Sequence, residues 1–564
     1  MLDLKTMSKE IITTKVGINT LKLNGYLMHS KYDPIKESER IVNDNYKPNF
    51  VHILYGYGLG YIVEQFKKTM TAEDKLIVIE PFLDIEVDNK NILLINKVNS
   101  ASEIKGMLFK NISVTDKVTL ICSPNYDKVF AEEYKEFLNS LKDYLYIAKI
   151  NENTIKISSD NWQKNYISNL SFAINDYSVK DLEKIYECPV VVASGGPSLT
   201  KQLPILKKYR DNVIIVASGS TINSLVSAGI EPDYVVSVDG AKINYEHYKN
   251  LRTTKTSLIY LMSNYSEIRT VFNTECYYTL GHSEKKLHEH LSSIVNEEIV
   301  LFRGGPSCAH YAFDFAQYIT SGPITLIGQD LAFTDNKTHA DDNVLGKKID
   351  NENIATTNYL EVEGYNGGKV LTNYSFLSMK ENFESLIHQN SNKVRLFNST
   401  EGGAKIYGIN QISFINFCER YCKEHIEKIL LEKTNRKKIS KDELIQKLEL
   451  EIELYSNMKL SLTDNKKIVL NNKSKISFSN SQLKKMDKND KKFEETVHKT
   501  ALRMSLDPIN LEVLKNFKSK LNETPEQQYN RVKEQNLFFY TRMIQAIDNI
   551  SLHTKELIEN LREY

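Results

Sequence analysis

Five short apolar runs in the middle of the chain each end in a polar loop that contains glycine. Runs that are apolar throughout are typical of strands buried on both faces, and the amphipathic segments between them predict helices. This alternation constrains the fold more than any other feature, because it predicts a doubly wound, mostly parallel sheet in an α/β protein. The runs are Cys188–Gly196, Asn212–Gly219, Asp233–Gly240, Glu298–Gly305 and Pro323–Asp330.

The loop after the first of these runs has the form of an anion-binding turn. Gly195 and Gly196 follow the apolar residues, and we expect a helix whose first turn contains Pro197 and which Ser198 caps. Glycines let a ligand approach the backbone, and the free N–H groups of a helix N-terminus favour phosphate. Taken alone, the pattern fits a plain strand-to-helix turn equally well.

Four further loops share this position at the carboxyl ends of predicted strands: Ala217–Thr221, Ser237–Gly240, Arg303–Ser307 and Gly328–Asp330. Ligands of open α/β sheets bind along that edge. The five loops therefore predict a crevice for a nucleotide or a phosphosugar. Within it, Asp239 is expected to hold a ribose hydroxyl or a metal ion, or else to act as a helix cap or turn carboxylate, and the pattern leaves both readings open.

A long polar stretch with little periodicity, Leu331–Asn343, follows the last loop. Such loops over a sheet edge often act as lids. The stretch contains His339, whose imidazole suits a general base near neutral pH, although most of the 12 histidines are expected to be ordinary surface residues. A zinc site of His339, Asp341 and Asp342 is the weaker hypothesis, because no helix or strand fixes a third ligand, and no metal ligand is predicted.

The first 150 or so residues predict a second, smaller α/β layer. An apolar strand leads into a GxGxG turn at Gly56–Gly60 and a helix, and the next strand, Lys75–Pro81, ends near Glu80. Further strands are expected at Asn91–Asn96 and Val118–Pro124. The arrangement imitates a dinucleotide or S-adenosylmethionine site, but the third glycine lacks the usual spacing, so we favour a structural turn or a vestigial site.

Changes in composition along the chain predict three domains. The first α/β layer occupies residues 1–175, and the domain with the five glycine-bearing loops occupies residues 176–425. In residues 426–564 glycine is absent, and patterns of Glu, Lys and Leu predict a helical domain. With 41% hydrophobic residues, the chain has enough apolar side chains for several cores.

Charge and composition exclude several classes of protein. The 73 Lys and Arg residues balance 72 Asp and Glu residues, which removes the bulk electrostatic argument for a nucleic-acid partner. The start lacks a signal-peptide pattern, and no run of about 18 apolar residues occurs, so we expect a cytoplasmic protein with no membrane span. The 6 cysteines form no CxxC pair and are expected to be reduced and to fill apolar space.

Seven blocks of sequence, in order along the chain, resemble the Maf proteins, a family of motility accessory factors identified as bacterial flagellin glycosyltransferases. The resemblance extends over most of the chain, and seven ordered blocks are more specific than any one glycine loop. The blocks are HSKYDP (His29–Pro34), LYGYGLGY (Leu54–Tyr61), ASGGPSL (Ala193–Leu199), AGIEPDYVVSVDG (Ala228–Gly240), GQDLAFTDNKTHA (Gly328–Ala340), GGKVLTNYSF (Gly367–Phe376) and TEGGAKIYG (Thr400–Gly408).

The resemblance implies both a fold and a reaction. It implies a Rossmann-like N-terminal domain, a central doubly wound domain similar to bacterial sialyltransferases, and a C-terminal all-α bundle. The implied enzyme moves a nonulosonic acid, pseudaminic or legionaminic acid, from its CMP-activated form to Ser or Thr hydroxyls of flagellin, with inversion, in support of flagellar assembly and motility. The implied partners are flagellin and the CMP-activated sugar. No cofactor or metal is expected to be required, because the leaving group is a monophosphate.

By this similarity, His339 is the catalytic base and Asp239 holds polar groups of the substrate. Pro306, Cys308 and His310 depart from the family pattern by making the segment after Gly305 bulkier, which leaves the role of Ser307 open. The residues implied to bind the nucleotide sugar are Gly195, Gly196, Pro197, Ser198, Ser218, Gly219, Ser220, Gly304, Gly305, Ser307, Gln329 and Asp330.

Two other functions remain open, because a scaffold does not by itself fix an activity. The central domain also resembles MptE-like pterin pyrophosphokinases, which would use ATP and Mg²⁺. The large flanking domains disfavour that enzyme, since a small-molecule kinase needs no surface for a protein acceptor. A non-enzymatic escort that binds flagellin would have a decayed nucleotide crevice, and the intact polar loops disfavour it.

Overall fold

The structure is a computed structural model. Its contacts divide the chain into two compact units, and parts of the C-terminal helices belong to each. The division therefore does not test the predicted domain boundaries after residues 175 and 425, which stay a prediction. The first unit comprises Met1–Asn153, Asn472–Phe478 and Asn510–Phe538, and the second comprises Thr154–Asn471, Ser479–Ile509 and Phe539–Tyr564. The structure describes residues 7–563 except 49, 72–73, 86–90, 97–103, 105, 109–110, 113–115, 342, 344–358, 391–393, 431–438, 475 and 520–522.

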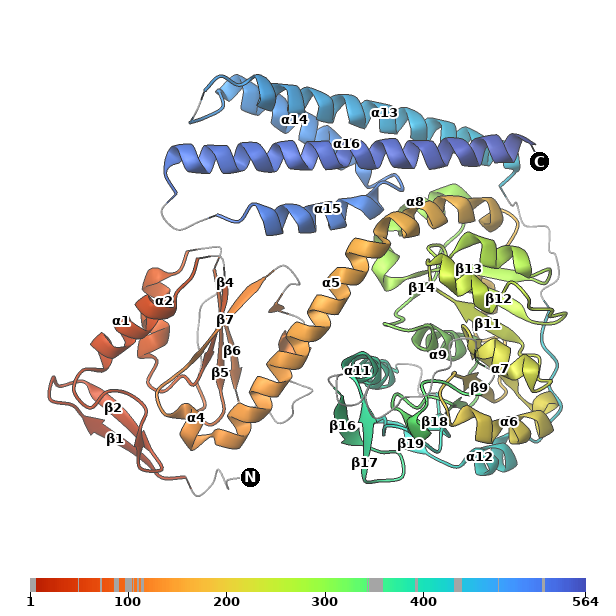
Figure 1. Cartoon of the computed structure of the whole chain (residues 1–564), viewed down its shortest axis with the longest axis horizontal. Helices are drawn as coiled ribbons and strands as arrows, with labels where there is room; N and C mark the ends of the chain where they lie inside the picture. Colours follow the sequence, from red (N-terminus) through yellow and green to blue (C-terminus); the bar gives the residue numbers. More distant parts are fainter. Residues whose placement is uncertain are drawn as a thin grey trace. The chain divides into compact units, whose positions relative to one another are not determined.

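The second unit is built on a ten-stranded sheet in which every described strand pairing is parallel (Figure 1). The order is β14-β13-β12-β11-β10-β9-β15-β18-β19, and β8 also pairs with β13. The strands are β8 (Tyr177–Ser178), β9 (Val190–Ala193), β10 (Ile214–Ser218), β11 (Tyr234–Ser237), β12 (Ser257–Leu261), β13 (Cys276–Gly281), β14 (Leu301–Phe302), β15 (Ile324–Ile327), β18 (Leu396–Asn398) and β19 (Asn410–Gln411).

The strand order reverses beside β9. The strands β10 to β14 extend to one side of it, and β15, β18 and β19 extend to the other. The junction of β9 and β15 is therefore the switch point at which open α/β sheets bind ligands. Together with the helical C-terminal region, this parallel sheet confirms the predicted fold class.

Small side chains bring a helix close to this sheet. The helix α9 (Cys308–Ile319) packs against β9, β10 and β11, and its buried face includes Ala309, Ala312 and Ala316. The other helices of this region are η2 (Val179–Leu182), α6 (Leu199–Lys208), η3 (Arg210–Asn212), α7 (Thr221–Ser227), η4 (Lys242–His247), η5 (Ser266–Val271), η6 (His282–Leu287), α8 (His288–Val295), η7 (Thr334–Asn336), α11 (Tyr374–His388) and α12 (Phe414–Tyr421). A separate hairpin joins β16 (Leu360–Glu363) to β17 (Lys369–Thr372).

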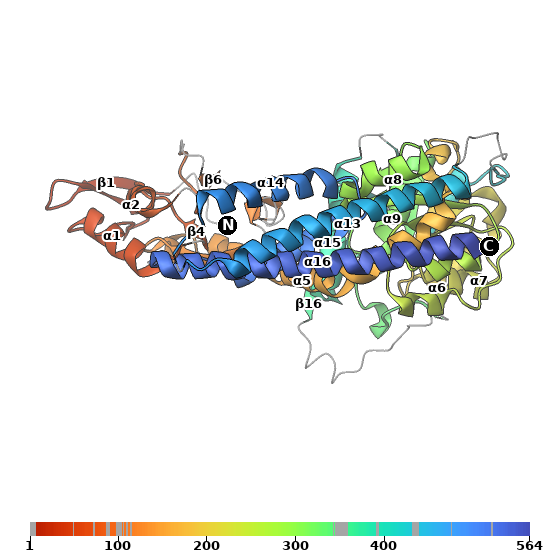
Figure 2. The same ribbon diagram turned by 90° about the horizontal axis from the view of Figure 1, so that it is seen from above.

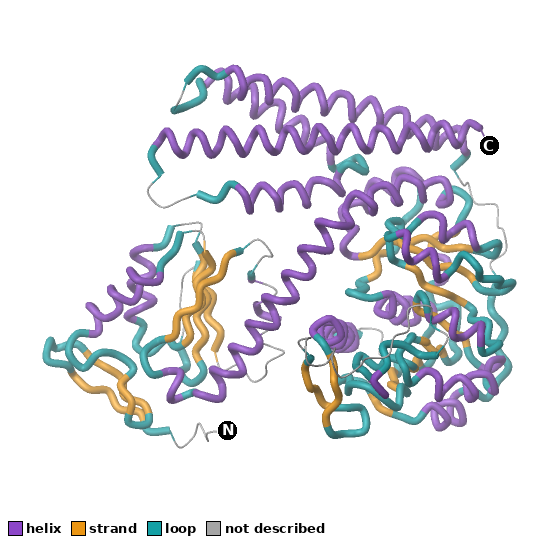
Figure 3. The backbone as a smooth tube through the Cα atoms, in the orientation of Figure 1, coloured by secondary structure: helices purple, strands orange, loops and turns teal. Residues whose placement is uncertain are grey.

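The first unit contains a four-stranded parallel sheet of order β6-β5-β4-β7 (Figure 3). Its strands lie where the apolar runs predict them: β4 (Phe50–Tyr55), β5 (Lys75–Glu80), β6 (Ile92–Asn96) and β7 (Lys117–Cys122). The remaining elements of its N-terminal part are β1 (Lys9–Thr13), β2 (Asn19–Leu23), β3 (Tyr26–Leu27), α1 (Pro34–Asn45), α2 (Tyr61–Thr69) and α4 (Tyr126–Val129).

Long helices complete the chain, and those after residue 440 lie in the glycine-free C-terminal sequence that predicts them (Figure 2). Within the second unit, a buried network joins them to the sheet domain. His290 Nε2 lies 3.0 Å from Glu451 Oε2, and Tyr166 Oη lies 2.7 Å from His290 Nδ1. The helices are α5 (Ala131–Ala173), α13 (Lys441–Asn471), α14 (Asn480–Val497), α15 (Arg503–Asn516) and α16 (Pro525–Glu563). In the described part of the chain, none is both long enough and apolar enough to cross a membrane.

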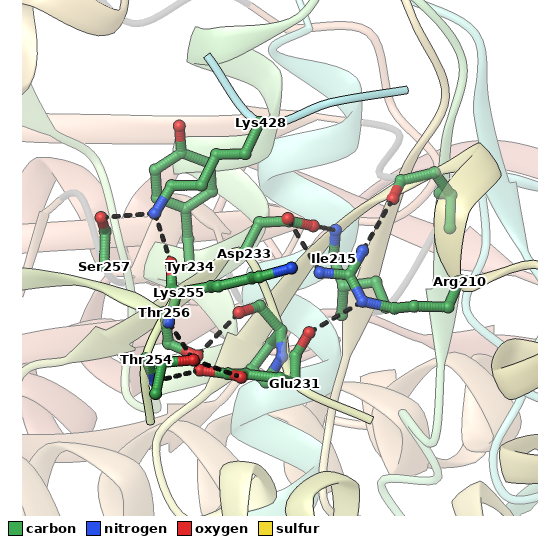
Figure 4. A network of polar contacts seen from close by, with 12 residues as sticks. Arg210, Ile215, Glu231, Asp233, Tyr234, Thr254, Lys255, Thr256, Ser257 and Lys428 are labelled. Carbon is green, nitrogen blue, oxygen red and sulfur yellow. Dashed lines mark hydrogen bonds and ion pairs between the residues drawn. The ribbon is translucent and has the colours of Figure 1, made fainter. Parts of the chain in front are cut away.

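A strap of residues 422–430 crosses the amino edge of the ten-stranded sheet. Lys428 Nζ donates to the carbonyl of Lys255 at 2.7 Å and to Ser257 Oγ at 2.6 Å, and it lies 5.0 Å from the centre of the Tyr234 ring (Figure 4). Beside it, Asp233 accepts from the amide of Ile215 and from Arg210. The strap is thus anchored where the strands begin.

Burial lowers the pKa of Lys428 from 10.5 to about 8, which gives a pH-dependent stability. Between about pH 8 and pH 10.5, Lys428 is mostly neutral in the folded state and still protonated in the unfolded state. The free energy of unfolding therefore rises with pH over this range. We therefore expect the free energy of unfolding of the wild type to rise relative to that of Lys428→Met between pH 8 and 9.5 in urea titrations. If the difference in the free energy of unfolding between the wild type and Lys428→Met stayed constant over this range, the expectation would be contradicted. Lys369→Met, on an exposed hairpin, is the matched control.

Candidate functional site

A cavity of about 330 Å³ lies at the carboxyl edge of the ten-stranded sheet, at the switch point between β9 and β15. The loops after β9, β10, β11 and β15 form much of its wall, and η4, the start of α9, the helix α11 and the polar stretch around His339 complete it. The position agrees with the predicted crevice, because all these strands are parallel and their carboxyl ends meet at one edge.

The cavity brings together most of the residues that the sequence singled out. Gly195, Asp239 and His339 come from three different loops and line the same space. Their roles stay predictions. A shared site requires the three residues to lie close together, and this condition is met. The predicted site residues that line the cavity are Gly195, Gly196, Pro197, Ser218, Gly219, Ser220, Asp239, Ser307, Gln329, Asp330 and His339.

Three predicted residues lie outside the cavity wall. Ser198 is buried, and its hydroxyl donates to Asp330 Oδ2 at 2.7 Å. Gly304 and Gly305 pack against neighbouring side chains instead: a Cβ at Gly304 would lie 2.1 Å from the ring of Tyr311, and one at Gly305 would lie 2.2 Å from Asn382 Oδ1. These two glycines are therefore required for packing, and their part in nucleotide binding stays a prediction.

The helix after the first glycine loop differs from the prediction. It begins at Leu199, and Ser198 makes no side-chain cap, because its own backbone is already helical. The acidic group at this helix N-terminus is instead Asp330. Its carboxylate accepts from the amide of Ser198 at 3.2 Å and from Thr334 Oγ1 at 2.6 Å. A phosphate at this helix N-terminus would have to share it with a buried carboxylate, whose pKa desolvation raises.

His339 is held over the first glycine loop by its neighbours in sequence. The amide of Ala340 donates to the carbonyl of Gly195 at 2.9 Å, and Ser224 Oγ donates to the carbonyl of Asp341 at 3.0 Å. The ring of His339 is half-buried, and burial, followed by the charge of His247, lowers its pKa. A neutral imidazole at pH 7 has the protonation state that a general base needs.

The zinc hypothesis gains no support from these contacts. Asp341 pairs with Lys337 at 2.8 Å, and Asp342 lies outside the described residues. Within the ranges that the structure describes, no group of three or more His, Cys, Asp or Glu side chains has the arrangement of a metal site. All 6 cysteines are free thiols, as predicted.

His310, one of the residues that depart from the family pattern, fixes the orientation of the Ser307 hydroxyl. His310 Nε2 lies 2.8 Å from the carbonyl of Met379, which can only accept, so Nε2 carries the ring proton. His310 Nδ1, 2.8 Å from Ser307 Oγ, then accepts the proton of the hydroxyl. Burial lowers the pKa of His310 to about 4, so the ring stays neutral. Ser307 therefore presents its lone pairs to the cavity.

The sequence patterns did not predict that the segment after Asp239 belongs to the site. Asn244, His247 and Tyr248 all line the cavity, from η4 and the residue after it. The signal that could have found them is positional, because η4 comes directly after a strand-end loop already assigned to the site. Asp239 itself is exposed in the cavity wall, and desolvation by the surrounding protein raises its pKa.

The N-terminal GxGxG turn is filled by the protein's own side chains. The amide of Tyr57 donates to Glu80 Oε2, that of Gly58 to Tyr126 Oη and that of Leu59 to His29 Nε2, each at 2.8 Å. A Cβ at Gly56 or Gly58 would lie 2.4 Å from the rings of Tyr126 and His29, respectively. The amides that would meet a phosphate are therefore occupied, which supports the interpretation as a structural turn or a vestigial site.

Comparison with known proteins agrees with this fold. Residues 164–336 match a family model described as 6-hydroxymethylpterin diphosphokinase MptE-like. The structure is similar to that of the Maf glycosyltransferase from Magnetospirillum magneticum AMB-1, with a TM-score of 0.56 and 14% sequence identity over 100% of this chain and 94% of that one. No curated protein matches the sequence. The chain thus has the fold of a Maf glycosyltransferase with an MptE-like central region, which confirms the resemblance that the seven blocks indicate.

The structural reading of the N-terminal turn predicts the effect of Glu80→Gln. Glu80 is fully buried and also accepts from Tyr126 Oη and from the amides of Phe82 and Leu83. The amide group of glutamine would face these donors, so we expect a loss of about 2–4 kcal/mol in the free energy of unfolding by urea titration.

The exposed Glu64→Gln is the matched control and should cost less than about 0.5 kcal/mol. A nucleotide-binding role would give the opposite pattern. Glu80→Gln would then be as stable as the wild type, and NAD⁺ or S-adenosylmethionine would raise the Tm of the wild type.

Proposed function

We propose that this chain is a Maf-family glycosyltransferase that moves a nonulosonic acid, pseudaminic or legionaminic acid, from its CMP-activated form to Ser or Thr hydroxyls of flagellin. The observation that carries the proposal is the position of His339, a half-buried imidazole in the wall of the switch-point cavity. The similarity of fold to a Maf glycosyltransferase over the whole chain supports it, as do the seven ordered sequence blocks.

In this proposal, His339 removes the proton of the acceptor hydroxyl as that oxygen attacks C2 of the sugar. The bond between C2 and the phosphate oxygen breaks through an oxocarbenium-like state, and CMP leaves with the bonding electrons. The configuration at C2 inverts, because attack and departure occur on opposite faces of the ring. The lowered pKa of His339 supports this role, since the ring is ready to accept a proton at pH 7.

The strand-end loops are the proposed site of the nucleotide. Ser218, Gly219 and Ser220 end β10 in the cavity wall, and Ser307 offers hydrogen-bond acceptors for amino or hydroxyl groups of CMP. Asp239 would hold polar groups of the substrate. We propose that no metal is required, because the leaving group is a monophosphate, so EDTA should leave the transfer unchanged.

A pterin pyrophosphokinase is the second candidate, because residues 164–336 match the MptE-like family model. That reaction would need carboxylates for Mg²⁺ beside ATP. Asp330 is a poor candidate for this task, since its carboxylate already accepts hydrogen bonds from Ser198 and Thr334. Pyrophosphoryl transfer from ATP to a hydroxymethylpterin, abolished by EDTA, would favour the kinase over the transferase.

Replacement of His339 tests the proposed base. In His339→Ala the transfer should fall by roughly 100-fold or more, as losses of a general base usually do. The measurement is the intact mass of flagellin co-expressed with the protein and a nonulosonic acid pathway. The exposed His425→Ala serves as the control. Transfer at the wild-type rate by His339→Ala would remove His339 from the mechanism.

Binding of CMP should survive in His339→Ala and can be followed by intrinsic fluorescence. Trp162 is the 1 tryptophan of the chain, and it packs on Gly240, where a Cβ would lie 2.5 Å from its ring. Gly240 follows Asp239 of the cavity wall, so a ligand there should change the emission. A non-enzymatic escort with a decayed crevice would bind flagellin but show no response to CMP.

The pH dependence of transfer follows from the lowered pKa of His339. The neutral ring is the active form, so kcat/KM should rise with pH and reach half its plateau below pH 6.5. His247 contributes to the lowering, because two neighbouring imidazoles resist double protonation. In His247→Gln the acid limb should therefore move to higher pH. An acid limb above pH 6.5 in the wild type would contradict the assignment of His339.

A further inference from the structure

Several polar groups of the cavity wall already have partners within the protein. Among the described residues of its wall there is no Lys or Arg. Hydroxyl groups of the wall also donate within the protein: Ser194 Oγ to Gln329 Oε1 at 2.6 Å, Ser237 Oγ to Asn264 Oδ1 at 2.9 Å, and Ser307 Oγ to His310. A phosphate carries oxygens that only accept, so its binding there depends on the donors that remain.

His247 differs from these hydroxyl groups. It is the last residue of η4, is 5% exposed and lines the cavity. Its Nδ1 is buried and has no hydrogen-bond partner in the described part of the chain. An orphaned, buried N–H group is rarer in proteins than an unused lone pair, so the proton of the neutral ring belongs on Nε2. Nε2 is then the polar atom that is left to face the cavity.

Burial keeps the ring of His247 neutral. Burial lowers its pKa, and the exposed Glu246 on the same element opposes this only in part. His339, from the polar stretch that also lines the cavity, is near enough to interact with His247, and burial lowers its pKa as well. Asp239 is the acidic group of the adjoining loop. His247 thus acts as a fixed, neutral donor.

We propose that His247 donates a hydrogen bond from Nε2 to a phosphate oxygen of the bound nucleotide. The nature of that nucleotide, CMP with its single phosphate, rests on the proposed function. The donor role does not depend on which phosphate group is bound, because a nucleotide of either candidate reaction brings phosphate to the same cavity. His247 is therefore a ligand-binding residue, distinct from the base His339.

Two variants of the full chain, His247→Gln and His247→Asn, test the assignment by calorimetry with CMP. The amide nitrogen of Gln occupies the place of Nε2, and that of Asn occupies the place of Nδ1. We expect His247→Gln to bind CMP within about threefold of the wild type and His247→Asn to bind at least about 10-fold more weakly, as is usual for loss of a hydrogen bond to a charged group. Thermal unfolding of both variants controls for stability. Equal weakening in both would overturn the proposal.

A second measurement does not depend on how the His247 variants fold. In His339→Ala at pH 8, the heat of CMP binding should be the same in buffers of different ionisation enthalpy, because a neutral donor takes up no proton. Proton uptake would show that His247 binds as an imidazolium and would overturn the assignment of a neutral donor.

The two hypotheses fail in different ways. If the wild type does not bind CMP, the proposed donor substrate is wrong, and the same variants are titrated with ATP and Mg²⁺. A difference between His247→Gln and His247→Asn with ATP would support the role of His247 without the proposed function. Binding of neither nucleotide to the wild type would overturn both.

Discussion

Asp330 places a carboxylate that is 2% exposed at the start of α6. Its oxygens accept from Ser198 and Thr334, and its backbone carbonyl accepts from the amide of Ala404 at 2.7 Å. A buried carboxylate without donors costs on the order of several kcal/mol, so these three segments adopt one arrangement together. Gly196 is required there, because a Cβ would lie 2.1 Å from Asp330 Oδ2. The first glycine loop and the start of the His339 segment are thus positioned by the same interaction.

The two glycine turns of the chain show that similar sequences can have opposite outcomes. Both follow a buried parallel strand and precede a helix. In the N-terminal turn, His29, Glu80 and Tyr126 take up the backbone amides, and the rings of His29 and Tyr126 fill the space above the glycines. After β9, the turn borders an open cavity and a long-range carboxylate holds its helix. A short motif therefore allows a ligand site, and the side chains packed over it decide whether the site is open.

The sequence predicted the elements of this fold better than the detail of its site. The apolar runs locate the strands, because residues buried on both faces of a parallel sheet must be apolar, and the carboxyl-edge rule then places Gly195, Asp239 and His339 together. The packing of Ser198 and Gly304 could not be predicted, because their neighbours Asp330 and Tyr311 are distant in sequence. His247 carries no motif at all. Its place in the cavity wall follows from the fold of η4, which has no periodic pattern.

The strap of residues 422–430 has a consequence for access to the cavity. Its anchors lie at the beginning of the strands: Lys428 bonds beside β12, and the amide of Ile426 donates to the carbonyl of Asp211 just before β10. The described strap, up to residue 430, thus lies at the edge of the sheet opposite the loops that line the cavity. The strap therefore does not restrict access to the cavity, whose wall contains none of its residues.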